Sequence, residues 1–430
     1  MKRTTILSLL FGAIIIVLGM SFSPAKNTPL EKNEGLEETS IEIIELNNSI
    51  TNFDSEIDDL AGLDRKMKNF INRWQIKGMS LAITRNDSLV YAKGYGWADK
   101  EKKIEMEPGH IMRIASISKL ITATGIMVLQ EQGKLKLSDK VFGNILKDSS
   151  YVNHIADKYT FDITVEHLLR HQAGFSRDPV FSSADVKKQM GLQHNPEFKD
   201  FAKLVLRNRL RHKPGEWQRY SNFGYMALSE VIEVISGEKY EDFIKNNVLA
   251  PAGCYDMHIG GIYYEDKREN EVRYYTHDGD GKYIAEFTGS GNIVERCYGG
   301  NNIPALSGAG AWIGSPIEIA RFVSSINGKP ELKDIISQES VEEMVEYFDE
   351  KTFPLGWNDT KPEKGWTRTG TLSGTTALIR YYPDGECWIM ITNTSTYRGP
   401  GHAKYGNALF EQCRINYSEF LPQRNLFEAN

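Results

Sequence analysis

The order of apolar and polar positions near the start of the chain predicts one helix followed by a β-hairpin. Between residues 56 and 74, apolar side chains recur every three or four positions, the spacing of a helix that packs on one face. Two apolar runs follow at residues 79–84 and 88–96, and Asn86-Asp87 between them favours a tight turn. We therefore expect the first two strands of the chain to pair with each other.

A second hairpin is predicted near the other end of the chain. The apolar runs at residues 375–382 and 387–392 flank a Pro-Asp-Gly turn at residues 383–385, which is a strong hairpin signal. A last helix is expected at about residues 402–415.

The middle of the chain reads mainly as helices. Residues 255–298 differ, because alternating Tyr, Gly and charged residues predict short strands and loops there. Strands at both ends and helices between them predict an α+β (α/β) sandwich: one antiparallel sheet flanked by the first and last helices, with an inserted, mainly helical lobe at roughly residues 120–250. The predicted helices of the middle segment cover residues 118–132, 164–170, 198–211, 222–236, 315–327 and 339–347.

The N-terminus has the pattern of an export signal. Lys2 and Arg3 precede an apolar run at residues 6–20, and small residues permit cleavage after Ala25. The run is long for a signal peptide, so an uncleaved membrane anchor is the alternative. We expect residues 1–25 to direct export, with the protein periplasmic or attached to the membrane and facing outward.

Composition divides the rest of the chain into three parts. Residues 26–53 are polar and acidic, which predicts a linker. Residues 54–415 are long enough to bury a large core and are expected to form the folded domain. Residues 416–430 are expected to be a C-terminal tail.

Charge and cysteine content narrow the classes of function. The chain has 430 residues and a formal net charge of −6, so it offers no basic footprint for nucleic acid. No metal-ligand spacing and no cofactor-binding loop stands out in the sequence, so neither a metal nor a cofactor is predicted. Buried thiols or a single bridge are expected for the four cysteines, Cys254, Cys297, Cys387 and Cys413.

Ser116 and Lys119 are the first candidates for chemistry. A serine and a lysine three residues apart at a helix start face the same way, so the amine can activate the hydroxyl as a nucleophile. The helix N-terminus also presents N–H groups that suit an oxyanion. The same spacing occurs at Ser23–Lys26 and Ser236–Lys239, but only Ser116 precedes an almost wholly apolar helix. A serine cap with a solvated lysine is the alternative reading.

Tyr220 and Asn222 are the second candidates. They open the predicted helix at residues 222–236, where a tyrosine can point its hydroxyl into a cleft. A phenol needs a neighbouring positive charge, here Lys119, to act as a base near neutral pH. The Asn222 amide suits holding Lys119 and a substrate amide. A helix cap with a packed tyrosine is the alternative reading.

Arg368, Thr369, Gly370 and Thr371 are the third candidates, just before the C-terminal hairpin. If they form an edge strand beside the site, the Thr371 N–H can complete an oxyanion hole with the Ser116 N–H. Gly370 would let a substrate backbone approach closely, and Arg368 could bind a substrate carboxylate with its fork of donors. An exposed arginine beside a turn is the alternative reading.

These motifs in series make the chain resemble the serine β-lactamase-related family, which contains class C β-lactamases, D,D-carboxypeptidases, D-aminopeptidases and related esterases. The resemblance covers roughly residues 60–395. It rests on the strings at residues 113–119, 163–174, 213–216, 220–225, 308–312 and 368–370.

The resemblance implies a β-lactamase/transpeptidase-like fold and acyl transfer without a cofactor. Ser116 matches the family nucleophile, Lys119 and Tyr220 match its base pair, and Asn222 matches an orienting residue. Family members usually carry Lys or His where this chain has Arg368, which stays charged and cannot shuttle protons. We expect the groups that carry out acyl transfer to be unaffected, and the arginine to influence which substrates are accepted.

Motifs and resemblance together predict an exported serine hydrolase that acts on small-molecule or peptide substrates. D-amino-acid peptides, β-lactams and short esters are the expected classes, with ester cleavage and slow β-lactam turnover. The alternative is a non-catalytic, penicillin-binding-like module that recognises cell-wall peptides or a protein partner. His171 could serve as a second base, but the matching family string is a loop that shapes the cleft, which favours a structural role.

Overall fold

The computed structural model describes residues 46–277 and 281–428 of this chain. The predicted signal or anchor at residues 1–25, and most of the predicted linker, lie outside the described residues. Within the described part, no helix is both long and apolar enough to cross a membrane.

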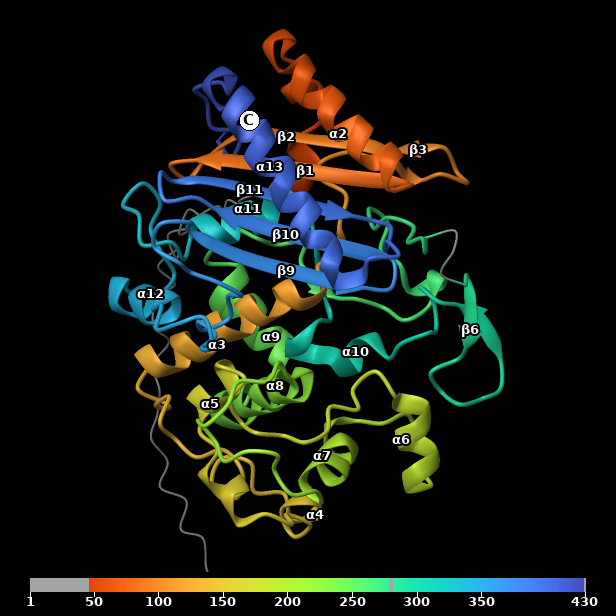
Figure 1. Cartoon of the computed structure of the whole chain (residues 1–430), viewed down its shortest axis with the longest axis vertical. Helices are drawn as coiled ribbons and strands as arrows, with labels where there is room; N and C mark the ends of the chain where they lie inside the picture. Colours follow the sequence, from red (N-terminus) through yellow and green to blue (C-terminus); the bar gives the residue numbers. More distant parts are fainter. Residues whose placement is uncertain (1–45, 278–280, 429–430) are drawn as a thin grey trace, which may run out of the picture. The chain divides into compact units, whose positions relative to one another are not determined.

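The first and last strands pair into one six-stranded antiparallel sheet (Figure 1). Its order is β3-β2-β1-β11-β10-β9, so the two predicted hairpins join where β1 pairs with β11, and β9 lies at an edge as expected. The strands of this sheet are β1 (Gly78–Arg85), β2 (Ser88–Asp99), β3 (Ile104–Glu105), β9 (Trp366–Leu372), β10 (Thr375–Tyr381) and β11 (Glu386–Thr392). Shorter pairings join β4 (Met112–Arg113), β8 (Trp312–Gly314) and β5 (His258–Ile259), and β6 (Tyr283–Ala285) with β7 (Ile293–Glu295).

Helices cover both faces of the large sheet, which gives the predicted α+β sandwich. Figure 1 shows α2 and α13 on one face, and α11 and the helical lobe on the other. Met79, Leu81 and Ile83 of β1 pack into the α2 and α13 side, while Ala82 belongs to the opposite core. Both faces of β1 are therefore buried, which explains why its sequence reads as a nearly continuous apolar run.

Two helices of the lobe begin at the predicted residues, and a third ends early. Ser118 starts α3 and Asn222 starts α8, as expected, whereas α7 stops at Leu206, because the Asn208 side-chain amide caps the Leu204 carbonyl (2.7 Å). The helices are α1 (Leu46–Ser49), α2 (Ala61–Arg73), α3 (Ser118–Glu131), α4 (Ser149–Val152), α5 (Val165–Leu169), α6 (Ser183–Met190), α7 (Phe198–Leu206), α8 (Asn222–Ser236), α9 (Tyr240–Ile244), α10 (Ile303–Leu306), α11 (Pro316–Ser324), α12 (Gln338–Val345) and α13 (Ala403–Tyr417).

Both ends of the described chain pack against the domain, which differs from the expected linker and tail. Asn47 in α1 donates to the buried Glu318 carboxylate (3.0 Å). Near the other end, Leu426 is buried and its N–H donates to the Leu89 carbonyl (2.8 Å). Residues 46–53 and 416–428 therefore belong to the folded body, because a few buried contacts outweigh their polar composition.

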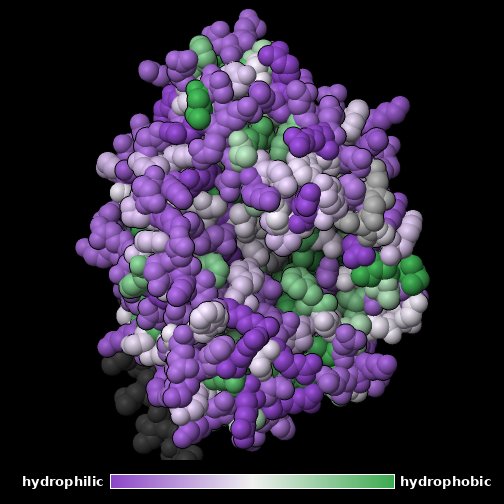
Figure 2. Space-filling view, viewed as in Figure 1, coloured by the Kyte–Doolittle hydropathy of each residue, from purple (hydrophilic) through white to green (hydrophobic). Residues whose placement is uncertain are grey.

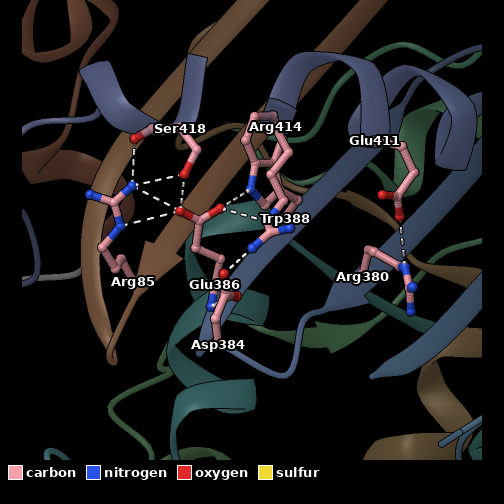
Figure 3. A network of polar contacts seen from close by, with 8 residues as sticks. All are labelled: Arg85, Arg380, Asp384, Glu386, Trp388, Glu411, Arg414 and Ser418. Carbon is pink, nitrogen blue, oxygen red and sulfur yellow. Dashed lines mark hydrogen bonds and ion pairs between the residues drawn. The ribbon is translucent and has the colours of Figure 1, made fainter. Parts of the chain in front are cut away.

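The C-terminal helix is tied to the sheet by an ion-pair network (Figure 3). Glu386 at the start of β11 accepts from Arg85 (2.8 Å), Arg414 (3.1 Å), the Trp388 indole (3.2 Å) and the Ser418 hydroxyl. Burial alone would raise the pKa of Glu386, but the bonds from Ser418, Arg85 and Trp388 lower it. The network holds the carboxylate in its charged form.

All four cysteines are buried free thiols, which is one of the two expected outcomes. Burial raises the pKa of the Cys413 thiol to about 12, so this side chain stays protonated near neutral pH. The thiols therefore act as small apolar side chains in the core.

Candidate active site

Ser116 lies in a tight 3-10 turn, η3 (Ala115–Ile117), that leads directly into α3. Ala115 in this turn has φ +48°, a left-handed conformation that alanine seldom adopts. Gly370 of β9 packs on the turn so closely that a Cβ there would lie 2.2 Å from the Ile114 oxygen. Gly370 therefore lets β9 approach the loop that carries Ser116, whereas the sequence suggested an approach by substrate.

Lys119 is fully buried beside Ser116, which excludes the solvated lysine of the alternative reading. Its Nζ donates to Asn222 Oδ1 (2.8 Å) and to the Ala309 carbonyl (2.6 Å), and it lies 3.4 Å from Ser116 Oγ. These two partners fix the amine beside the hydroxyl. Asn222 thus has the orienting position that the sequence predicts.

Tyr220 reaches the same hydroxyl from the lobe. Its phenol oxygen lies 2.7 Å from Ser116 Oγ, and its ring is 4.7 Å from Lys119 Nζ. The tyrosine is 37% exposed, so it stands at the surface of the site rather than in the core. Serine, lysine and tyrosine, far apart in the sequence, therefore converge on one oxygen atom.

The charges around this group favour a base near Ser116. Burial lowers the pKa of Lys119, and the Arg368 charge lowers it further, although Tyr220 acts in the opposite direction. Burial would raise the pKa of Tyr220, but the charges of Lys119 and Arg368 and the hydrogen bonds from Lys119 and Ser116 bring it below its ordinary value. Both shifts make proton acceptance possible closer to neutral pH.

The Arg368 side chain points to the backbone of Ser116. It is fully buried, and its Nε (2.9 Å) and Nη2 (2.5 Å) both donate to the Ser116 carbonyl oxygen. Along β9, Arg368, Gly370 and Leu372 are buried, while Thr369 and Thr371 are half-buried on the other side of the strand. The geometry therefore differs from the expected grip on a substrate carboxylate, because strand alternation turns the arginine inward.

Several contacts of the site have no clear signal in the sequence. The Asn358 side-chain oxygen accepts from the Thr369 N–H (2.7 Å), and the Asp178 carboxylate accepts from the Asn222 N–H (2.6 Å) at the start of α8. The Ala309 oxygen that holds Lys119 belongs to the main chain. Residue identity alone does not mark such partners, because they depend on where distant loops meet.

A cavity of about 400 Å³ lies between α8, α10 and residues 194–198 at the start of α7. Met226 lies one helical turn from Asn222 in α8, and Ser307 lies two residues before Ala309, so the cavity borders the two segments that hold Lys119. In Figure 2, apolar and weakly polar side chains gather around α10 and also at the edge near β6, on a largely hydrophilic face. The lining combines the apolar Met226, Pro304 and Ala305 with His194, Glu197 and Glu230.

Within residues 46–277 and 281–428, no group of three or more His, Cys, Asp or Glu side chains is arranged to hold a metal ion.

A family model described as Beta-lactamase matches residues 63–412, which is most of the chain. The chain belongs to the beta-lactamase family. The family resemblance of the motifs is thereby confirmed, and with it the expectation of a serine hydrolase family. The catalytic and substrate-binding roles of individual residues stay predictions.

Curated and solved proteins agree with this membership. The chain is 28% identical over 398 residues to the putative penicillin-binding protein PbpX of Bacillus subtilis, covering 89% of this chain and 88% of that protein. A penicillin-binding protein homologue from Pyrococcus abyssi superposes with a TM-score of 0.63 at 23% identity, over 87% of this chain and 79% of that one. A D-amino acid amidase from Ochrobactrum anthropi gives 0.64 at 19% identity, over 85% and 99%. At these identities the solved structures show the shared fold, and they confirm the predicted β-lactamase/transpeptidase-like architecture.

Proposed function

We propose that this chain is an exported serine hydrolase that forms an acyl-enzyme at Ser116 with amide or ester substrates. The observation that carries the proposal is the convergence of the Tyr220 hydroxyl (2.7 Å) and the buried Lys119 amine (3.4 Å) on Ser116 Oγ. A serine hydroxyl needs such an adjacent base to attack a carbonyl carbon. The fully buried amine and the lowered pKa of Tyr220 supply one.

The reaction would proceed in two steps. In acylation, the Lys119–Tyr220 pair takes the Ser116 proton, Oγ bonds to the substrate carbonyl carbon, and the leaving group departs with that proton. The Ser116 and Thr371 N–H groups stabilise the oxyanion formed on the way. In deacylation, the same base takes a proton from a water molecule while the water oxygen bonds to the ester carbon, and the base returns that proton to Ser116 Oγ as the bond to the acyl group breaks and the acid leaves.

Among the expected substrate classes, we propose that acyl donors without a free carboxylate next to the scissile bond are preferred. Both donor groups of Arg368 that reach Ser116 are occupied by its carbonyl, and the residue is inaccessible to solvent. Because these donors are already bonded, short esters and D-amino-acid amides fit the site better than β-lactams or peptides with a terminal carboxylate. The cavity between α8 and α10 offers room for an uncharged acyl group.

The test is covalent labelling and turnover by the purified protein and by Ser116→Ala. We expect the unmodified chain to be labelled by a fluorescent penicillin and to hydrolyse an activated ester, and Ser116→Ala to lose both. Ser236→Ala is a matched control, because Ser236 has the same spacing to Lys239 but ends α8. Labelling without any turnover would favour the non-catalytic module, and unchanged labelling of Ser116→Ala would refute the proposal.

Export is a separate part of the proposal and rests on residues 1–25. We expect the chain to be found outside the cytoplasm, periplasmic or attached to the membrane through this segment. Fractionation of cells that produce the full chain, compared with a variant lacking residues 1–25, tests this. Equal cytoplasmic retention of both forms would contradict it.

A further inference from the structure

His171 contacts the predicted base, but the proposed chemistry gives it no role. It follows α5 and has φ +57°, a left-handed conformation that a non-glycine residue seldom adopts. It is 2% exposed. Such a backbone conformation persists only where the surroundings impose it, and it is often found at functional sites.

Three contacts join His171 to the loop that carries Tyr220. The His171 carbonyl accepts from the Arg219 N–H (2.8 Å), and its Nδ1 accepts from the Ser221 N–H (3.1 Å). Its ring packs against the Tyr220 ring, with the two centroids 4.5 Å apart. One residue thus fixes the backbone amides on both sides of the predicted base and one face of its ring.

The bond from Ser221 requires an unprotonated Nδ1. The ring is surrounded by the ammonium of Lys119 from α3, the guanidinium of Arg368 from β9 and the phenol rings of Tyr220 and Tyr225. Burial and the two positive charges keep the pKa of His171 well below its usual value, so the imidazole remains a neutral acceptor. A neutral, immobile ring suits a supporting role better than proton transfer.

We propose that His171 is the positioning residue for Tyr220: by clamping the backbone on both sides of the tyrosine, it holds the phenol oxygen within hydrogen-bond distance of Ser116 Oγ. The inference rests on the proposed acyl-enzyme function. A catalytic group displaced by about 1 Å typically loses about 100-fold in rate. Because His171 is not among the residues that line the cavity between α8 and α10, its loss should act on kcat rather than on KM.

The experiment compares three variants in the hydrolysis of an activated ester. His171→Ala removes the acceptor and the ring, whereas His171→Asn keeps a side-chain acceptor in a residue that tolerates positive φ. His167→Ala is the matched control, because Nδ1 of His167, in the short helix α5 that precedes His171, also accepts a backbone N–H, that of Thr164 (3.1 Å). A thermal unfolding curve of each variant identifies an assay temperature at which that variant is folded.

We expect His171→Ala to lower kcat about 100-fold with KM within about twofold, and His171→Asn to regain at least about tenfold of that loss. His167→Ala should keep kcat within about threefold. The proposal is overturned if folded His171→Ala keeps nearly full kcat, if His171→Asn restores nothing, or if His167→Ala loses as much.

If His171→Ala does not fold, His171→Phe replaces it, because it keeps a ring for packing and removes the acceptor. Loss of kcat in His171→Phe but not in His171→Asn supports the clamp, and equal kcat in the two overturns it. Ser116→Ala, assayed in parallel, separates the two proposals. Unchanged turnover in Ser116→Ala refutes the acyl-enzyme itself, whereas an active chain with unaffected His171 variants refutes only the positioning role.

Discussion

At the scale of single residues, the site depends on the buried guanidinium of Arg368, which donates hydrogen bonds to the backbone carbonyl of Ser116. Arg368 holds the Ser116 carbonyl and lowers the pKa of both Lys119 and Tyr220 through its charge. A guanidinium suits this role because it stays charged when buried and offers two donors to one oxygen. In this chain Arg368 therefore supports the turn at Ser116 directly.

Replacing Arg368 tests this electrostatic role. Arg368→Gln removes a positive charge that favours the phenolate, so the pKa of Tyr220 rises. Because the reaction needs the deprotonated base, the ascending limb of the kcat/KM profile against pH should move to higher pH. Arg368→Lys keeps the positive charge and is the control. Its ascending limb should lie at nearly the same pH as that of the unmodified chain. Superimposable profiles for all three proteins would contradict the role.

A pair of matched substrates tests the expected preference for uncharged acyl donors. We expect a peptide ending in D-alanyl-D-alanine amide to be cleaved at least about tenfold faster, as kcat/KM, than the same peptide with a free carboxylate. A tenfold difference corresponds to about 1.4 kcal/mol of transition-state stabilisation. Faster cleavage of the free acid would show that the site binds a carboxylate despite the buried arginine.

The identities of the site residues were more predictable from the sequence than the orientations of their side chains. Ser116, Lys119, Tyr220 and Asn222 converge as predicted, because short motifs report residue type and order. The orientation of Arg368 was missed although β9 carries a usable signal: Leu372, two positions beyond Gly370, marks that side of the strand as apolar. The clamp of His171 depends on backbone groups, which no motif describes.

At the scale of elements, the contact between sheet and C-terminal helix combines apolar packing with buried charge. The hairpins and the last helix were predictable, because turn residues and apolar runs are local signals. The network around Glu386 was not, since its partners come from β1, β11 and α13, which are far apart in the sequence. It explains why a glutamate begins a strand that is otherwise buried throughout.

Glu386→Gln should destabilise the protein by about 2 to 3 kcal/mol at pH 7, because two arginines lose their common charged partner. The pKa of Glu386 is lowered in the folded state, so its contribution is complete above the ordinary carboxyl pKa and is lost as the pH falls through the folded-state value. Urea unfolding at pH 7 and near pH 3 should therefore show a difference that shrinks on acidification.

Glu411→Gln is the control for this prediction (Figure 3). Its carboxylate lies 3.6 Å from Arg380 and is 49% exposed, so its loss should cost less than about 1 kcal/mol. Equal destabilisation by the two substitutions would show that burial of Glu386 adds nothing.

At the scale of the whole described chain, both ends are parts of the domain. The acidic composition of residues 26–53 suggested a linker, yet Asn47 reaches Glu318 and Asp256, both buried, on the body of the protein. Composition averages over a segment, whereas docking depends on particular residues, here Asn47 between two carboxylates, the buried Ile50 and Asn52 bonded to Met106. Domain boundaries are therefore less predictable from sequence than the elements inside them.

The Asn47 contact should become more important as the pH rises. Burial raises the pKa of Glu318 to about 7, and the bond from Asn47 opposes this shift by favouring the charged form. Since the pKa of Glu318 is higher in the folded than in the unfolded state, the protonated acid favours folding, and stability falls as the pH rises toward and through 7.

Asn47→Ala removes a donor from the ionised Glu318 carboxylate, so we expect a loss of about 2 to 3 kcal/mol in the free energy of unfolding at pH 8 and a smaller loss at pH 5, measured by urea unfolding. Ser49→Ala, in the same short helix, should cost less at both values. A loss for Asn47→Ala that is larger at pH 5 than at pH 8 would show that Glu318 is not the group that Asn47 stabilises.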